Sequence, residues 1–382
     1  MVLALYIGFV FYFLMLLILI LGWRQGGTNN SVIKAEGNAP FISVIIPARN
    51  EAKNIEDLLA DLAKQTYPQF QVVVVDDHSE DNTSSSVVGA IVGDPRFRLI
   101  KNEGAGKKAA LATGIKIASG PILVTTDADC RVSSEWLSAL TSSFDNEKVK
   151  MVFGPVRMES TNLFSSLQSL EFASLIGSGM SMASWNYPIM CNGANLAFRK
   201  TAFDEVGGHD DNLHIPSGDD EFLMRKIQAR YPGGVRPAFH RQSVVSTSPN
   251  ITLNEFLQQR IRWAGKWPHN TSLLSKALAV FIFCFQLSIV LLPLLVATGR
   301  VDIKLGAILV LSKASIEFLF LKMVSNFLSL RWNWVAFAIL QFVYPLYVVF
   351  VGLLSNFNSF DWKGRKLKSL TVSDKLNKEI LG

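Results

Sequence analysis

The chain has 382 residues, of which 49% are hydrophobic, with a formal net charge of +6 and three scattered cysteines. This length accommodates one sizeable globular domain together with membrane segments. The cysteines offer neither paired metal-ligand spacing nor a disulfide framework, which agrees with a reducing compartment. The basic residues lie beside hydrophobic segments and no nucleic-acid-binding motif accompanies them, so the positive charge favours a membrane surface rather than nucleic acid as the partner.

The first hydrophobic segment is a candidate membrane anchor. Residues 2–21 carry no charge, and about 20 such residues suffice to cross the hydrocarbon core of a bilayer. Arg24 follows the segment and no basic residue precedes it, so the positive-inside rule places the next domain in the cytosol. A cleaved signal peptide is the alternative, but the segment has neither a charged leading region nor a small-residue cleavage site. We therefore expect an anchor over residues 1–22 and a Gly-, Asn- and Ser-rich linker over residues 23–40.

Strand-like and helix-like segments alternate through the middle of the chain. The apolar runs that we assign to strands cover residues 41–46, 70–75, 97–100 and 121–126. Helical patterns fall between them, for instance over residues 104–118. Continuous β-branched strands that alternate with helices indicate an α/β fold with a mostly parallel sheet covered on both faces. We assign this domain to residues 41–250 and expect its ligands at the carboxyl ends of the strands.

Polar residues follow three of these strands. Residues 47–51 follow the first strand, Asp76 and Asp77 the second, and Asp127 and Asp129 the fourth. Like charges as close as those of Asp127 and Asp129 repel each other unless a cation neutralises them. A Mg²⁺ or Mn²⁺ ion there would bridge the phosphates of a nucleotide. Asp76 and Asp77 are suited to accept hydrogen bonds from a base and a ribose. Surface or capped turns are the alternative for both pairs.

A glycine-rich segment precedes the helical pattern over residues 104–118. Gly104 and Gly106 give it a flexible backbone, and Lys107 and Lys108 place two cations near the start of a helix, which suits phosphate contact. The spacing differs from the phosphate-binding loop of nucleoside triphosphatases, so this signal is weak by itself.

A third acidic motif, Gly218-Asp219-Asp220, precedes another helical pattern. One carboxylate can cap that helix. The second could face the pocket and act as a general base on a sugar hydroxyl. Capping alone is the alternative.

Two amphipathic segments follow the strands. Residues 162–184 are rich in small residues, and Gln168 and Glu171 interrupt their apolar character, so we expect an interfacial helix. Residues 251–276 contain Gln259-Arg260-Ile261-Arg262-Trp263 and then Trp267. These side chains either anchor the helix at the membrane surface or hold a diphosphate with a guanidinium and support a sugar with an indole.

The C-terminal part contains further membrane candidates. Residues 277–297 and 335–354 carry no charge, whereas residues 305–321 contain Lys313 and Glu317 at positions i and i+4. That pair could be buried inside a bundle or line an acceptor path. We expect two or three spans over residues 277–355. The basic tail over residues 356–382 favours the cytoplasmic face, so the number of spans and the side of the tail stay open.

The motifs together resemble those of family 2 glycosyltransferases. The set is Pro47-Ala48-Arg49-Asn50-Glu51, Asp76-Asp77, Asp127-Ala128-Asp129, Gly218-Asp219-Asp220 and Gln259-x-x-Arg262-Trp263. Their order and approximate spacing over residues 40–270 are similar to those of the membrane-bound, inverting branch, which includes cellulose and hyaluronan synthases and bacterial carotenoid glycosyltransferases. Each motif alone is common, and the combination is specific.

The resemblance implies a GT-A fold, a nucleotide-sugar donor, with a UDP-sugar expected, and Mg²⁺ or Mn²⁺. Asp127 and Asp129 would hold the metal, and Asp220 would be the catalytic base, with Asp219 as the alternative. The implied donor-binding residues are Pro47, Glu51, Asp76, Asp77, Lys108, Asp127, Asp129, Gln259, Arg262 and Trp263. The chain departs from the family's pattern at two positions: it has Asp219 where the family often has Glu, and Cys130 where the synthases often have His.

The resulting prediction is an inverting glycosyltransferase in the cell (inner) membrane, multi-pass, with a cytosolic catalytic domain. Few spans are available for a polysaccharide channel, which favours transfer of one sugar to a lipid over synthesis of a polymer. A processive polysaccharide synthase with a glycan acceptor is the alternative, and the Gln259-x-x-Arg262-Trp263 motif supports it. A non-enzymatic membrane scaffold is a third possibility, which the intact acids of every motif oppose.

Overall fold

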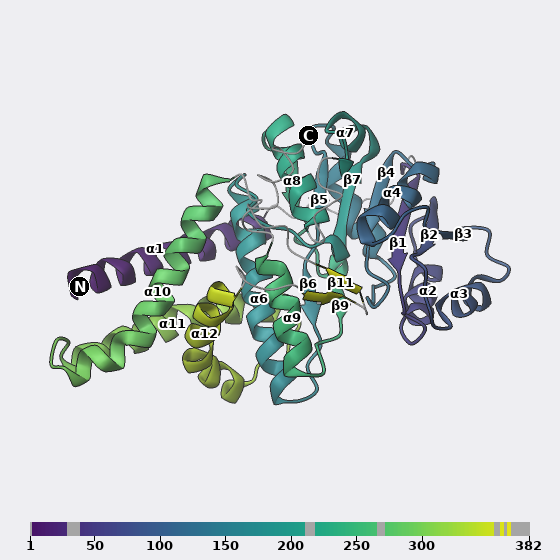
Figure 1. Ribbon diagram of the computed structural model, residues 1–382. Helices are drawn as coiled ribbons and strands as arrows, with labels where there is room; N and C mark the ends of the chain where they lie inside the picture. The colour runs from purple at the N-terminus through teal and green to yellow at the C-terminus, as the bar shows by residue number, and fades with distance from the viewer. Residues whose placement is uncertain are drawn as a thin grey trace, which may run out of the picture.

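The computed structural model describes residues 2–28, 39–210, 218–265, 272–354, 360–362 and 365–367. A sheet with its covering helices forms one end of the molecule, and four long helices form the other (Figure 1). Helix α6 lies between these two parts (Figure 1).

The principal sheet has seven strands in the order β3-β2-β1-β4-β7-β5-β8. Strand β7 is antiparallel to both of its neighbours, and the remaining pairs are parallel. The bounds are β1 (Ile42–Ala48), β2 (Phe70–Asp76), β3 (Phe97–Lys101), β4 (Ile122–Thr125), β5 (Met151–Phe153), β7 (Leu196–Arg199) and β8 (Val235–Pro237). The predicted α/β class with a mostly parallel sheet is therefore confirmed.

The central strands β1, β2 and β4 are buried on both faces because most of their positions are apolar. In β2, Val73 and Val75 belong to one hydrophobic cluster, while Val72 and Val74 belong to another on the opposite face. This is the alternation that a pleated strand imposes. The flanking elements are α2 (Ile55–Ala63), α3 (Thr83–Ile91), α4 (Lys107–Ile117), α5 (Trp136–Thr141), α7 (Lys200–Glu205), α8 (Asp219–Arg230), the short 3₁₀ helices Ser142–Asp145, Gly193–Asn195 and Arg241–Ser243, and a separate two-stranded parallel sheet of β6 (Val156–Met158) and β9 (Val245–Thr247).

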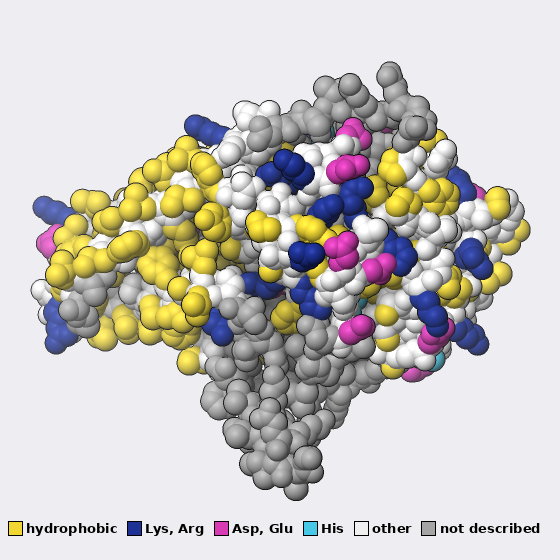
Figure 2. Space-filling view, turned by 90° about the horizontal axis from the view of Figure 1, so that it is seen from above, with side chains coloured by type: hydrophobic (Ala, Val, Ile, Leu, Met, Phe, Trp, Pro, Cys, Tyr) yellow, Lys and Arg dark blue, Asp and Glu magenta, His cyan; other side chains and the backbone are white. Residues whose placement is uncertain are grey.

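The long helices are α1 (Val2–Thr28), α10 (Leu273–Ala297), α11 (Ile303–Phe327) and α12 (Trp334–Leu354). By length and composition, α1, α10 and α12 are apolar enough to cross a membrane, and hydrophobic side chains cover the end of the molecule that they form (Figure 2). In α11, the Lys313 ammonium lies 2.8 Å from the Glu317 carboxylate, and Lys313 is buried. Glu317 lines the large cavity described below, so the pair fits both of the expected alternatives. Glu317 also accepts a hydrogen bond from Tyr12 of α1.

Several expected boundaries differ from those of the structure. Helix α1 continues to Thr28, so the first residues of the expected linker are helical, and most of the rest lies outside the described residues. The amphipathic segment expected over residues 251–276 corresponds to α9 (Leu253–Ala264), but Trp267 lies outside the described residues. In the tail, β10 (Phe360–Trp362) and β11 (Arg365–Leu367) pair antiparallel, and residues 368–382 are not described.

Helix α6 (Leu163–Ser184) differs from the expected amphipathic interfacial helix. Most of its length is buried, and it packs against α1, α11 and α12. Its small residues permit these contacts: a Cβ at Gly177 would lie 2.6 Å from the Val324 side chain of α11, and a Cβ at Gly22 of α1 would lie 2.5 Å from the Ser181 carbonyl oxygen. The small residues therefore permit close helix packing, and the location of α6 at the membrane interface stays a prediction.

Candidate active site

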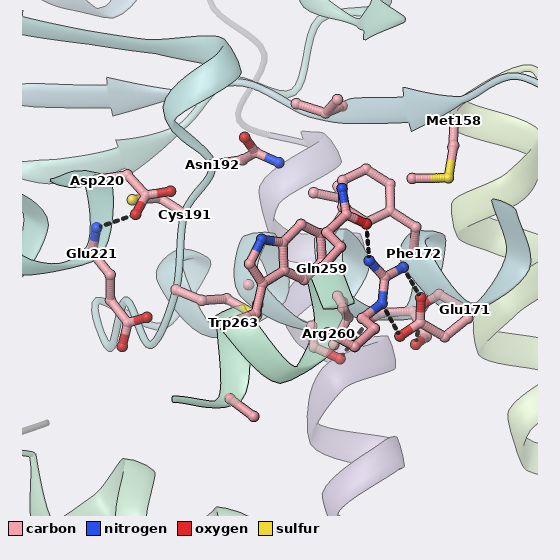
Figure 3. Close-up of a pocket in the computed structure, with 18 of the residues that line it drawn as sticks. Met158, Glu171, Phe172, Cys191, Asn192, Asp220, Glu221, Gln259, Arg260 and Trp263 are labelled. Carbon is pink, nitrogen blue, oxygen red and sulfur yellow. Dashed lines mark hydrogen bonds and ion pairs between the residues drawn. The ribbon is translucent and has the colours of Figure 1, made fainter. Parts of the chain in front are cut away.

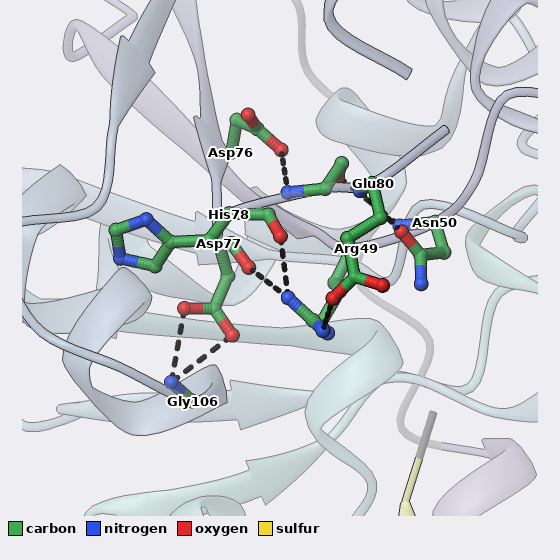
Figure 4. Close-up of polar contacts among 8 residues, drawn as sticks. Arg49, Asn50, Asp76, Asp77, His78, Glu80 and Gly106 are labelled. Carbon is green, nitrogen blue, oxygen red and sulfur yellow. Dashed lines mark hydrogen bonds and ion pairs between the residues drawn. The ribbon is translucent and has the colours of Figure 1, made fainter. Parts of the chain in front are cut away.

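Asp76 is the last residue of β2 and Asp77 follows it, but their side chains have different environments. Asp77 accepts hydrogen bonds on both carboxylate oxygens from the Gly106 amide at 3.0 Å (Figure 4), and its side chain lines the large cavity described below. Asp76 instead accepts from the Ser79 amide at 3.1 Å and the Ser84 hydroxyl at 2.8 Å. Asp77 is thus placed to meet a ligand, whereas Asp76 holds the turn after β2.

Arg49, from the first motif, stabilises the same turn. Its guanidinium donates to the Asp77 and His78 carbonyl oxygens and forms an ion pair with Glu80 at 2.7 Å (Figure 4). Pro47 and Glu51 of this motif line the cavity, and the Glu51 carboxylate accepts from the Asn54 side chain at 2.9 Å. The first two motifs therefore form one wall at the carboxyl ends of β1 and β2.

Two neighbouring lysines at the start of α4 have different partners, and it is Lys107 that contacts the acidic residues. The Lys107 ammonium lies 2.7 Å from Asp127 and 3.7 Å from Asp219. Lys108 lies over the Phe222 ring at 5.2 Å and also borders the cavity. Consecutive helical residues point about 100° apart, so the two lysines at the start of α4 face different groups.

Asp127 and Asp129 follow β4 and both line the cavity. Asp129 accepts from the Thr247 hydroxyl at 3.3 Å. Burial, together with the charges of Asp129 and Asp127, raises the pKa of the Cys130 thiol well above its ordinary value. A protonated, buried thiol is a poor metal ligand, so we do not expect Cys130 to bind the metal.

The two carboxylates suit a hard cation that completes its coordination with phosphate oxygens and water. Across the described part of the chain, no group of three or more His, Cys, Asp or Glu side chains is arranged to hold a metal. Mg²⁺ in particular is commonly held by one or two carboxylates plus substrate phosphates rather than by an all-protein cage. The donor set at Asp127 and Asp129 fits that type of site.

Asp219 and Asp220 lie at the start of α8 and face different partners. Asp220 accepts from the Gly193 amide at 2.9 Å and from the Glu221 amide at 2.7 Å. Burial alone would raise the pKa of Asp219. The nearby positive charge of Lys107, and then those of His209 and Lys108, have a larger effect and lower this pKa below its ordinary value. Both carboxylates line the cavity, so either one can meet a ligand there.

The last motif approaches the same acids from α9. Arg262 and Trp263 line the cavity. Burial lowers the pKa of the Arg262 guanidinium. The negative charges of Asp219, Asp127 and Asp220 act in the opposite direction but do not outweigh burial. The structure therefore brings residues of all five motifs to one cavity.

A buried ion pair beneath this motif was missed at the sequence level. Arg260 donates to Glu171 of α6 at 3.2 and 2.5 Å, and to Gln259 at 2.5 Å (Figure 3). Its guanidinium lies over the rings of Trp263 at 4.3 Å and Phe256 at 4.6 Å. The available signal was Glu171 itself, because a charged residue in an otherwise apolar helix needs a partner.

One cavity of about 2150 Å³ connects the motifs with the long helices. A pocket for a drug-sized ligand measures about 300–1,000 Å³, so this volume leaves space for a second substrate beside a donor. Its polar part is lined by the acidic motifs and α9, and its apolar part by side chains of α1, α6, α10 and α12, including Met15, Phe172, Phe281 and Val348.

The fold and this site together define a GT-A glycosyltransferase. The mannosyltransferase PcManGT from Pyrobaculum calidifontis, solved in complex with GDP-Man and Mn²⁺, has the same fold: the TM-score is 0.58, the match covers 88% of this chain and 98% of that chain, and the sequences are 20% identical. At this identity the likeness concerns the fold alone.

Sequence comparison gives the family. Residues 43–207 match Glycosyl transferase family 2. Glycosyltransferase AglE of Haloferax volcanii is 30% identical over 226 residues, which cover 58% of this chain and 71% of AglE. Poly-beta-1,6-N-acetyl-D-glucosamine synthase of Staphylococcus aureus is 26% identical over 228 residues, and the match covers 58% of this chain but only 53% of the synthase. The chain belongs to glycosyl transferase family 2, and its donor is a nucleotide sugar.

Proposed function

We propose that the protein is an inverting glycosyltransferase that moves one sugar from a nucleoside diphosphate sugar to a lipid acceptor. The observation that supports the lipid acceptor is the cavity, which continues from the carboxylates of Asp127 and Asp220 to apolar side chains of the long helices. A lipid can keep its chain among those side chains while its hydroxyl group reaches Asp220.

The donor lies against the ends of β2 and β4 in this proposal. Asp77 binds the nucleoside, on a turn that Asp76 stabilises. Asp127 and Asp129 would hold Mg²⁺ or Mn²⁺, which when bound neutralises negative charge on the departing diphosphate. Arg262 adds a second cation from α9, and Pro47, Glu51, Lys108, Gln259 and Trp263 complete the walls around the donor.

Asp220 performs the proton transfer. Its carboxylate takes the proton of the acceptor hydroxyl, and the hydroxyl oxygen forms a bond to the anomeric carbon. The bond from that carbon to the diphosphate oxygen breaks on the opposite face, so the configuration inverts and the nucleoside diphosphate leaves with the bonding electron pair. Gly193 supports this role because its amide holds the Asp220 carboxylate.

The proposed arrangement in the cell follows from the long helices. Helices α1, α10 and α12 cross the inner membrane, and residues 41–250 form the cytosolic catalytic domain. The number of C-terminal spans depends on α11, whose ion pair between Lys313 and Glu317 is compatible with a membrane helix that faces protein neighbours.

Lipid mass spectrometry tests the proposal. Membranes that contain the full chain are incubated with a panel of UDP- and GDP-sugars and Mg²⁺ or Mn²⁺, beside membranes with the Asp220→Asn variant. We expect one new glycolipid with one donor, and its loss in the variant. Near-normal turnover by Asp220→Asn would exclude this residue as the base. Transfer only to water-soluble acceptors would exclude a lipid as the acceptor.

A processive polysaccharide synthase is the second candidate. The similarity to poly-beta-1,6-N-acetyl-D-glucosamine synthase and the Gln259-x-x-Arg262-Trp263 motif favour it. Product size separates the two candidates, because a polymerising enzyme yields a ladder of oligomers rather than one glycolipid. Sugar transfer by the purified protein would exclude a non-enzymatic scaffold.

A further inference from the structure

Lys107 connects two acidic motifs that are far apart in sequence. Its ammonium lies 2.7 Å from Asp127 Oδ1, at the end of β4, and 3.7 Å from Asp219 Oδ2, at the start of α8. A Cβ at Gly193 would lie 3.1 Å from Asp219 Oδ2 and 3.6 Å from the Lys107 ammonium. The cation therefore lies at the point where the metal-binding motif and the motif of the base meet.

The environment of Lys107 keeps it charged. An ammonium group is charged at neutral pH, and the carboxylates of Asp127 and Asp219 beside it favour that charged form. A permanent positive charge thus contacts an oxygen of Asp127, the residue proposed to hold the divalent cation. A metal ion and an ammonium cannot share that oxygen without strong repulsion.

Rotation of the lysine side chain would relieve this repulsion. Lys107 is the first residue of α4, and the loop before it contains Gly106, with a φ of 91°. The start of a helix attracts phosphate groups. An ammonium that leaves Asp127 can therefore contact the donor diphosphate, which carries negative charge at the same place.

We propose that Lys107 competes with the divalent cation for Asp127, and that donor diphosphate relieves the competition by providing Lys107 with a new partner. This inference rests on the proposed function for the location of the donor. Its thermodynamic consequence is that metal and nucleotide each strengthen the binding of the other, and that Lys107 supplies part of this coupling. The residue thereby makes metal binding depend on the presence of the donor.

Mn²⁺ binding tests the proposal without any measurement of sugar transfer. Free Mn²⁺ is quantified by electron paramagnetic resonance with the purified full chain, in the presence and absence of UDP or GDP. The variants are Lys107→Met, which removes the charge, and Lys107→Arg, which keeps it. Lys116→Met is the control, because Lys116 is on the same helix, pairs with Glu103 at 3.1 Å and is exposed.

Without nucleotide, Lys107→Met should bind Mn²⁺ about tenfold more tightly than the wild type, as expected when one charge-assisted hydrogen bond no longer competes. The gain in Mn²⁺ affinity on addition of nucleotide should shrink in the same variant. Lys107→Arg and Lys116→Met should both retain the coupling of the wild type.

An equal or weaker Mn²⁺ affinity of Lys107→Met without nucleotide would overturn the proposal and leave Lys107 as a structural link between α4 and α8. Failure of the proposed function is distinguishable from this result. If no sugar is transferred to lipid but the coupling of Mn²⁺ and nucleotide depends on Lys107, the acceptor assignment is wrong and the role of Lys107 stands.

Discussion

Replacement of Glu171 by Gln is expected to destabilise the protein through the buried ion pair with Arg260. The Glu171 and Arg260 side chains are 5% and 3% exposed, so water does not screen the pair. The variant keeps the shape of the side chain but removes the charge that compensates the guanidinium. Removal of one partner of a buried pair costs about 3–5 kcal/mol, a large part of the about 5–15 kcal/mol that stabilises an average domain.

The loss of the Glu171 charge should also affect the active site. Arg260 is held between Phe256 and Trp263 and also donates to Gln259. A guanidinium that moves toward water would therefore displace the residues of α9 that border the donor. We expect Glu171→Gln to lower both the unfolding temperature of the full chain in detergent and its rate of sugar transfer.

The double variant Glu171→Gln/Arg260→Met provides the control. It removes both charges, so no uncompensated guanidinium stays buried, and replacement of a whole buried pair is often close to neutral. We expect it to recover most of the lost stability, as measured by thermal denaturation. Less than about 1 kcal/mol of destabilisation in the single variant, or a double variant as unstable as the single one, would refute this reasoning.

Three further substitutions test other parts of the site. Gly193→Ala places a Cβ 3.1 Å from Asp219 Oδ2 and 3.5 Å from the Asp220 Cβ. The initial rate of sugar transfer should fall by about tenfold, which corresponds to about 1.4 kcal/mol of lost transition-state stabilisation. The unfolding temperature should change little. Burial lowers the pKa of His209 from its ordinary 6.5 to about 4. Between these pH values the unfolded chain binds a proton on this residue and the folded protein does not. The free energy of unfolding of the wild type should therefore fall by about 3 kcal/mol as the pH drops from 6.5 to 4. Thermal denaturation across that range should show a smaller loss for His209→Phe, and equal losses would contradict the assignment. Asp127→Asn should abolish transfer, and a chelator should do the same to the wild type until Mn²⁺ or Mg²⁺ is restored; full activity of the chelated enzyme would exclude the metal.

The parts of the fold that depend on local pattern could be predicted from the sequence. The valines of β2 are apolar on both faces of the strand, so their burial in a parallel sheet follows from composition. Because parallel strands end at a common edge, the approach of Asp77 and Asp127 follows from their positions after β2 and β4. Both carboxylates line the same cavity.

The features that could not be predicted depend on the direction of side chains and on partners distant in sequence. The choice between Lys107 and Lys108 is set by the rotation of α4 about its axis, which the pattern does not determine. The burial of α6 depends on α1 and α11, since Gly177 is a contact residue only when Val324 packs against it. The partner of Glu171 lies 89 residues away, beyond the range of any local rule.

The packing of α1 against the rest of the chain makes the catalytic domain dependent on the long helices. Trp23 of α1 is buried and packs edge-to-face on Phe239 at 5.0 Å, and the Trp185 indole at the end of α6 donates to the Ile18 carbonyl oxygen at 3.1 Å. A fragment limited to residues 41–250 would expose Phe239 and the apolar side of α6 to water. We expect this fragment to aggregate in gel filtration, whereas the full chain in detergent stays monodisperse. A soluble fragment with a cooperative thermal transition would refute this expectation and show that the sheet and α6 fold without the long helices.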